Sequence, residues 1–142
     1  MALKVPLEGL EWLLNKLKDN WGNLTLHLYS NDKTPTDADI VDDYTEASFS
    51  GYAEVSINAW ADAVKNTDNI HWQVQGTAIT FTHNGGGQTT NCYGYYVTAL
   101  KGLSAGAVAL LWAERFSNPP VAMAVLGDFI TVVPVLQDRT EY

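Results

Sequence analysis

Residues 91–116, which read NCYGYYVTALKGLSAGAVALLWAERF, carry the clearest secondary-structure pattern of the chain. Aromatic and β-branched residues alternate with their neighbours from Tyr93 to Thr98, and a second alternating run extends from Val108 to Arg115. A period of two with these residue types is typical of β-strands. The Gly/Ser-rich segment between the runs is typical of a turn. We therefore predict an antiparallel strand pair.

Five more runs of the same kind predict further short strands: Leu24–Tyr29, Phe49–Ile57, His71–Val74, Ala78–His83 and Phe129–Leu136. Pro134 has no backbone N–H, so we expect the last strand at a sheet edge or a bulge. Residues 84–87 predict a hairpin tip, and Asn58–Asn69 an irregular or short helical connection. Short strands spaced by roughly ten residues favour an antiparallel β-sandwich or jelly roll.

The N-terminal segment predicts one short amphipathic helix over about residues 6–19. Its leucines recur at intervals of three and four residues, the spacing of one helical face: Leu7, Leu10, Leu13, Leu14 and Leu17. Polar residues interrupt this segment, so we expect neither a secretory signal nor a membrane span. We predict a single mainly β domain, residues 1–142, with this one N-terminal helix.

The charge of the chain argues against several classes of partner. Among 142 residues, 16 are acidic and 8 are basic, which gives a net charge of −8. Nucleic-acid binding requires clustered lysine and arginine, and anionic membranes attract the same residues. We therefore expect neither partner. Cys92 is the single cysteine, so an internal disulfide is excluded, and we expect this residue to be a small buried hydrophobe.

Residues 30–48, SNDKTPTDADIVDDYTEAS, form a polar and acidic stretch that predicts a long loop or arm. Loops of this length are usually functional or mobile. We expect this arm to lie over a neighbouring protein and to become ordered on assembly. Its aspartates also raise calcium binding as an alternative, but the glycine and terminal glutamate of an EF-hand are missing. A solvated acidic loop is the favoured interpretation.

Two patterns that could indicate catalysis or metal binding are weak. Gly102–Gly106 matches the G-x-S-x-G motif, in which Ser104 would be the nucleophile. That motif requires a following helix and a later histidine, whereas a strand pattern follows and no histidine comes after His83. His27, His71 and His83 fall in separate strands without paired spacing, so zinc is not expected. We predict no catalytic residue, no cofactor and no metal.

Five tryptophans are many for this length: Trp12, Trp21, Trp60, Trp72 and Trp112. Those in strands are expected to be core residues. Trp60 lies in a connection, where an exposed ring could stack on a sugar or anchor an interface.

Five segments after the helix resemble small structural proteins of tailed bacteriophages: Leu26–Pro35, Tyr44–Tyr52, Tyr93–Thr98, Leu111–Phe116 and Gly127–Pro134. In this chain they read LHLYSNDKTP, YTEASFSGY, YGYYVT, LWAERF and GDFITVVP. The resemblance implies a virion protein, namely a capsid decoration (cement) protein or a head or tail accessory. It implies a location on the capsid or tail surface after synthesis in the bacterial cytoplasm. It carries over no catalytic residue.

The resemblance implies that the protein acts through protein–protein contacts, with the major capsid protein as the favoured partner. A homotrimer is expected because capsid shells present threefold sites. The candidate interface residues are Leu10, Leu13, Leu17, Asp37, Asp39, Tyr44, Trp60 and Phe129. Two alternatives remain open: a tail-tip or fibre module that binds host glycans through Trp60 and the loops at 58–69 and 85–87, and a hydrolase that uses Ser104.

Overall fold

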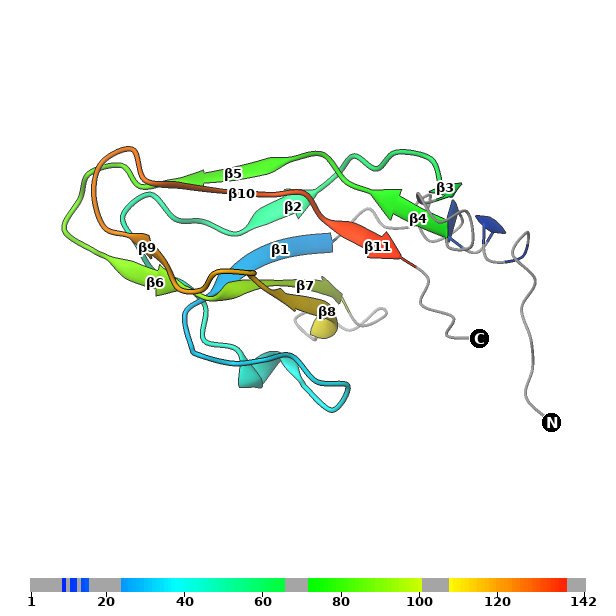
Figure 1. Ribbon diagram of the computed structural model, residues 1–142, viewed down its shortest axis with the longest axis horizontal. Helices are drawn as coiled ribbons and strands as arrows, with labels where there is room; N and C mark the ends of the chain where they lie inside the picture. The colour runs from blue at the N-terminus through cyan, green and yellow to red at the C-terminus, as the bar shows by residue number, and fades with distance from the viewer. Residues whose placement is uncertain are drawn as a thin grey trace. The chain divides into compact units, whose positions relative to one another are not determined.

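The computed structural model describes residues 24–65, 72–100 and 108–137, together with Gly9, Glu11, Trp12, Leu14 and Asn15. This part of the chain is mainly β (Figure 1). Every strand pair with a defined register is antiparallel. The prediction of a mainly β, antiparallel fold is therefore confirmed.

The described elements are eleven strands and one 3₁₀ turn. They are β1 (Leu24–Tyr29), η1 (Val41–Asp43), β2 (Val55–Ile57), β3 (Val64–Lys65), β4 (Trp72–Gln75), β5 (Ile79–Thr82), β6 (Thr90–Cys92), β7 (Gly94–Leu100), β8 (Val108–Arg115), β9 (Val121–Met123), β10 (Phe129–Val132) and β11 (Val135–Gln137).

The chain divides into two compact units, of which the larger comprises Asn23–Ser56 and Ile79–Val132. Four strands form its main sheet in the order β2-β1-β7-β8. Two smaller sheets have the orders β10-β5 and β6-β9. The apolar side chains of β1, at Leu24, Leu26 and Leu28, are almost completely buried. They form part of the core of this unit.

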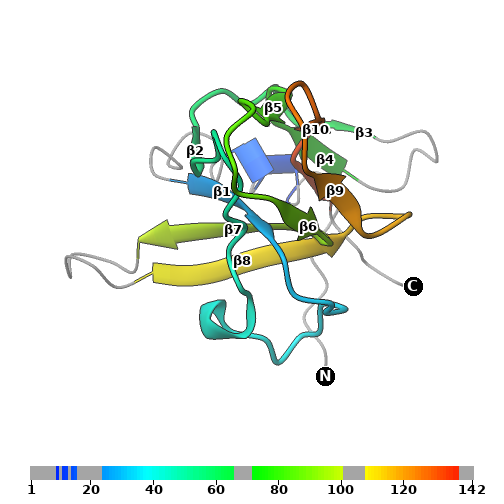
Figure 2. The same ribbon diagram turned by 90° about the vertical axis from the view of Figure 1, so that its left-hand side faces the viewer.

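The predicted strand pair in residues 91–116 is confirmed as β7 and β8, which run from the pair Gly94↔Arg115 to the pair Leu100↔Val108 (Figure 2). The register shifts between Val97 and Thr98, which marks a bulge. In β7, the consecutive residues from Tyr95 to Thr98 are all buried, so both faces of this strand are covered at that point. The alternation of residue types in the sequence of β7 therefore does not indicate that one face of this strand is exposed to solvent.

The smaller unit comprises Met1–Gly22, Ile57–Ala78 and Val133–Tyr142. Its three-stranded sheet has the order β11-β4-β3. The five described residues between 9 and 15 have helical backbone, Leu14 is buried, and the Asn15 side chain accepts a hydrogen bond from the Ala63 N–H at 3.0 Å. The rest of the predicted helix, including the interface candidates Leu10, Leu13 and Leu17, lies outside the described residues.

Two predicted elements near the middle of the chain are wrong in part. In the strand predicted at Phe49–Ile57, only Val55–Ile57 has strand structure. Residues 49–52 form a turn instead, since the Tyr52 N–H donates to the Phe49 carbonyl at 3.0 Å and Gly51 has φ +96°. The connection at 58–69 contains the short strand β3 where we expected irregular or helical structure.

The strand predicted at Phe129–Leu136 is divided by Val133 and Pro134 into two strands in different sheets. β10 pairs with β5, and β11 pairs with β4. Proline cannot donate a ladder hydrogen bond, but its carbonyl can accept one, and the Gly76 N–H donates to the Pro134 carbonyl at 2.8 Å. The three-residue strands β6 and β9 were not predicted, because such short segments carry no periodicity.

Candidate interaction site

Residues 30–48 form a closed loop, named here the arm loop, between β1 and the segment that leads to β2. The Asn31 side chain bonds both the Asp43 carbonyl and the Thr45 N–H, each at 2.9 Å. The Ser30 N–H donates to the Thr45 carbonyl at 2.8 Å. These bonds join the two ends of the loop, as in an Ω-loop. We expected an arm that orders on assembly; the structure has instead a loop closed by its own residues.

The carboxylate of Asp39 organises the interior of the arm loop. It accepts hydrogen bonds from the Thr36 hydroxyl at 2.5 Å, the Thr36 N–H at 3.0 Å and the Tyr44 hydroxyl at 2.6 Å. The Lys33 ammonium lies 3.1 Å away. These donors, the Thr36 hydroxyl first, lower the pKa of Asp39 well below its usual range. Two predicted interface residues, Asp39 and Tyr44, are thus brought together, and Asp39 has little remaining capacity to bind a partner.

An aromatic cluster attaches the arm loop to the main sheet. Tyr44 packs edge-on against Tyr29, with ring centroids 5.1 Å apart, and stacks on Tyr96 at 5.2 Å. All three rings are buried. Burial raises the pKa of Tyr29 and of Tyr96 to about 12, so both hydroxyls stay protonated at neutral pH. The Arg115 side chain, at the end of β8, adds bonds to the Lys33 carbonyl at 2.9 Å and to Asp32 at 2.6 Å.

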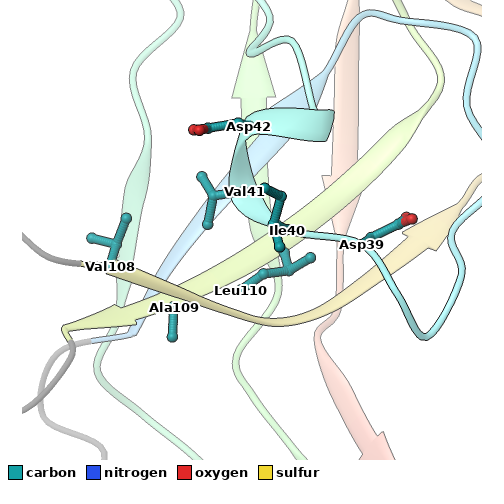
Figure 3. A pocket seen from close by; sticks show the side chains of 7 residues that line it. All are labelled: Asp39, Ile40, Val41, Asp42, Val108, Ala109 and Leu110. Atoms are coloured by element: carbon teal, nitrogen blue, oxygen red, sulfur yellow. The ribbon is translucent and has the colours of Figure 1, made fainter.

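A pocket of about 350 Å³, named here the arm pocket, lies between the η1 turn and the start of β8 (Figure 3). Its lining consists of residues 39–42, which lead into η1, and of the first three residues of β8: Asp39, Ile40, Val41, Asp42, Val108, Ala109 and Leu110. Ile40 is 59% exposed and Val108 is 42% exposed. The arm pocket therefore combines apolar walls with two carboxylates, which Figure 3 shows directed to opposite sides.

The sequence analysis missed Ile40 and Val108 as candidate residues, although a signal for the first was present. Ile40 and Val41 are the only large aliphatic residues between residues 30 and 48. Aliphatic side chains in a polar loop either reach the core or stay exposed for contact. Asp37, which we did predict, lies on the same loop and is exposed, but it does not line the arm pocket.

Phe129 belongs to a second exposed surface, named here the apolar tip, with Val125 and Leu126. These three side chains are 66%, 62% and 74% exposed, respectively. The Asp128 carboxylate accepts hydrogen bonds from the backbone N–H groups of Ala124 and Val125, at 2.8 and 2.9 Å. These bonds lower the pKa of Asp128. These two hydrogen bonds fix the conformation of the turn, which presents the three apolar side chains to solvent.

Trp60 belongs to the smaller unit. It forms an isolated bridge with Gly76 and lines a pocket of about 480 Å³ together with Asp62, Gln75 and Thr77, among others. The ring is partly exposed, so it is accessible to a ligand at this pocket.

His27 bridges a carboxylate and a hydroxyl. Its Nδ1 lies 2.9 Å from the Glu46 carboxylate, and its Nε2 lies 3.0 Å from the Thr98 hydroxyl. This is the order of groups in nucleophilic triads. However, Thr98 is 5% exposed in the interior strand β7, so its hydroxyl is out of reach of a substrate. We assign these bonds a structural role, because they join the end of the arm loop to β1 and β7.

The described residues contain no group of three or more His, Cys, Asp or Glu side chains that could hold a metal ion. Cys92 is fully buried, as predicted, and burial raises the pKa of its thiol to about 11, which keeps the thiol protonated. Ser104, the nucleophile of the hydrolase alternative, lies outside the described residues. Within the described part of the chain, no helix has the length and apolar character required to cross a membrane.

Comparisons of the chain with protein-family models, with curated proteins and with solved structures gave no match. The functional argument therefore depends on the geometry of the surfaces described above and on the resemblance between sequence segments.

Proposed function

We propose that this protein is a structural component of a tailed-bacteriophage virion, either a capsid decoration (cement) protein or a head or tail accessory. It acts through protein–protein contacts, and the major capsid protein is the favoured partner. The proposal includes a jelly-roll-like sandwich, a homotrimeric state and a location on the capsid or tail surface.

The observation that carries the proposal is the arm loop. Its ends are joined by side-chain and backbone bonds, its interior is fixed by Asp39, and its base is packed on buried tyrosines. A loop that is already fixed in this way loses little conformational entropy when it binds a partner, so it is well suited to a protein–protein contact. Ile40 is exposed on this loop, and the carboxylates of Asp37 and Asp42 form no ion pair with any residue that the structure describes, so these side chains are available for contact.

A binding experiment with purified phage heads tests the proposal. Heads that lack accessory proteins are mixed with the protein and separated by sedimentation, and the bound copies per head are counted. We expect saturable binding in multiples that match threefold or quasi-threefold sites. Size-exclusion chromatography with light scattering should give three chains per particle in solution. A monomer that never cosediments with heads or tails would refute the proposal.

The second candidate is a tail-tip or fibre module that binds host glycans, which the pocket beside Trp60 favours. An aromatic ring next to the polar side chains of Asp62, Gln75 and Thr77 is a common arrangement in sugar sites. A glycan array should then give a signal that Trp60→Ala weakens at least tenfold. The cement proposal expects no glycan signal. A hydrolase would show ester hydrolysis that Ser104→Ala abolishes.

A further inference from the structure

The exposed loop at residues 84–87, named here the glycine loop, follows β5 and contains the one Asn-Gly sequence of the chain, Asn84-Gly85. The side-chain amide of an asparagine is an electrophile at Cγ, and the backbone nitrogen of the next residue is the nearest nucleophile. Glycine at the next position leaves this nitrogen accessible, because it carries no side chain. The hydrogen bonds around this pair of residues decide whether the two atoms can react.

His83 binds the hydrogen of the nucleophile. Its Nδ1 accepts a hydrogen bond from the Gly85 N–H at 3.0 Å, and its Nε2 lies 2.8 Å from the Gln88 carbonyl oxygen. A carbonyl can only accept, so Nε2 carries the proton of the neutral ring and Nδ1 has a free lone pair. A general base must lie about 2.6–3.2 Å from the atom whose proton it removes. Nδ1 of His83 meets this condition for the Gly85 nitrogen.

Asn84 is held as the electrophile. The Gly86 N–H donates to Asn84 Oδ1 at 3.2 Å, and the Asn84 N–H donates to the Ser50 carbonyl at 2.9 Å. A Cβ at Gly51 would lie 3.2 Å from Asn84 Cγ, so the Asn84 side chain packs directly on this glycine. A donor on the amide oxygen stabilises the negative charge that develops there when Cγ is attacked.

The base is fixed by the fold, whereas the reacting side chain is open to water. His83 is fully buried, and its ring stacks on Phe49 with centroids 6.0 Å apart. Its backbone N–H donates to the Asp128 carbonyl at 2.8 Å, and its carbonyl accepts the Gly127 N–H at 3.1 Å. Asn84 is exposed. Catalytic groups that are held in place before reaction lower its entropic barrier.

We propose that Asn84-Gly85 is a self-modification site, at which His83 acts as general base in the conversion of Asn84 to aspartate and isoaspartate. Nδ1 of His83 removes the proton of the Gly85 nitrogen as this nitrogen bonds to Asn84 Cγ. The bond from Cγ to the side-chain nitrogen breaks, and that nitrogen takes up the transferred proton and leaves as ammonia. A water molecule then opens the cyclic succinimide at either of its C–N bonds, which gives aspartate or isoaspartate.

Either product changes the surface beside the apolar tip. The new carboxylate adds a negative charge at residue 84, and isoaspartate also lengthens the backbone by one methylene. A Cβ at Gly85 would lie 3.3 Å from Leu126, so the glycine loop is in close contact with the apolar tip. The reaction requires no partner protein and is therefore independent of the proposed function.

The rate of the reaction in the folded chain and in the same chain unfolded in urea tests the inference. Both states contain the Asn-Gly sequence, but only the folded state places His83 on the Gly85 N–H. Peptide mapping by mass spectrometry detects the replacement of the amide NH₂ by OH, and enzymatic methylation detects isoaspartate. At neutral pH we expect the folded chain to react at least about tenfold faster. A folded rate equal to or below the rate in urea would overturn the inference.

Asn118 is the internal control, because the nitrogen of Pro119 carries no hydrogen and cannot form the succinimide; Asn118 should stay unchanged in both states. His83→Asn tests the base, since its amide oxygen can still accept the Gly85 N–H but is not basic. With the fold checked by circular dichroism, this variant should react at least about tenfold more slowly than wild type when folded and at the same rate in urea. A folded variant that reacts at the wild-type rate would refute the role of His83. If the variant does not fold, the two wild-type rates decide the outcome.

Discussion

At the scale of single residues, Asp39 shows how an acidic side chain in an exposed loop can serve structure. Its carboxylate accepts bonds from a backbone N–H and from two hydroxyls, and it lies beside Lys33. We predicted from the sequence that Asp39 is a contact residue, because composition does not show which aspartates have hydrogen-bond partners within the protein. Asp42, three residues later, has no such partners within the described chain.

The Tyr44 hydroxyl should stabilise the arm loop measurably. Tyr44→Phe removes the 2.6 Å bond to Asp39 and keeps the ring in the buried cluster. A hydrogen bond to a charged acceptor contributes about 1.5 kcal/mol, so urea unfolding should show a loss of about that size. Tyr93→Phe is the matched control, because the Tyr93 hydroxyl forms no hydrogen bond with the described residues. Equal losses in both variants would contradict the role of Asp39 as acceptor.

The stability of the protein should fall in acid through Asp39. The folded-state pKa of this group is lowered, so its stabilising effect is complete above the unfolded value of about 4 and is lost as the pH falls toward the lower folded value. Asp39→Asn should therefore be less stable than wild type at pH 7, and the difference should shrink between pH 5 and pH 2. Urea unfolding at several pH values measures it. A difference that does not change with pH would show that Asp39 is not the titrating group.

At the scale of elements, the sequence predicted strands where a pattern extends over four residues or more. β1, β5, β7 and β8 were found in this way. Segments of two or three residues, such as β3, β6 and β9, have no measurable period and depend on partners far along the chain. The division at Pro134 was anticipated in part, since the missing N–H was recognised, but the change of sheet depends on tertiary packing.

The candidate site was predictable in location but not in chemistry. The length and acidity of residues 30–48 indicated a contact loop. The second wall of the pocket is formed by Val108–Leu110, which are about 70 residues from the arm loop in sequence. These residues lie beside the loop only because β8 occupies the end of the main sheet. No local pattern encodes such a meeting of distant segments.

Gly94 should be intolerant of any side chain, because β7 is packed closely on its neighbours there. A Cβ at this position would collide with the Glu114 carbonyl oxygen and with the Tyr29 ring. A collision with backbone cannot be relieved by a rotamer change, so Gly94→Ala should cost about 2 kcal/mol or more of unfolding free energy. Gly87→Ala is the control, since nothing lies within 4 Å of its Cβ position, and it should change stability by no more than about 0.5 kcal/mol. Similar values for the two variants would contradict the packing at Gly94.

At the scale of the whole molecule, the described surface offers two different means of contact. The arm loop is acidic and carries more than half of the net charge of −8. The apolar tip presents Val125, Leu126 and Phe129 and would bind by burial of apolar surface. Binding through these two surfaces should depend differently on salt concentration. Screening weakens attraction between charges, while apolar burial is not weakened.

The salt dependence of head binding should therefore identify which surface makes the contact. If the arm loop binds a basic partner, affinity for heads should fall at least tenfold between about 0.05 and 0.5 M sodium chloride, because the Debye length shrinks from more than 10 Å to a few ångströms. Asp42→Lys should reduce this slope, and Phe129→Ser should leave it unchanged. Affinity that holds or rises with salt, and that Phe129→Ser abolishes, would assign the contact to the apolar tip instead. Sedimentation of labelled protein with heads at four salt concentrations gives the slope for each variant.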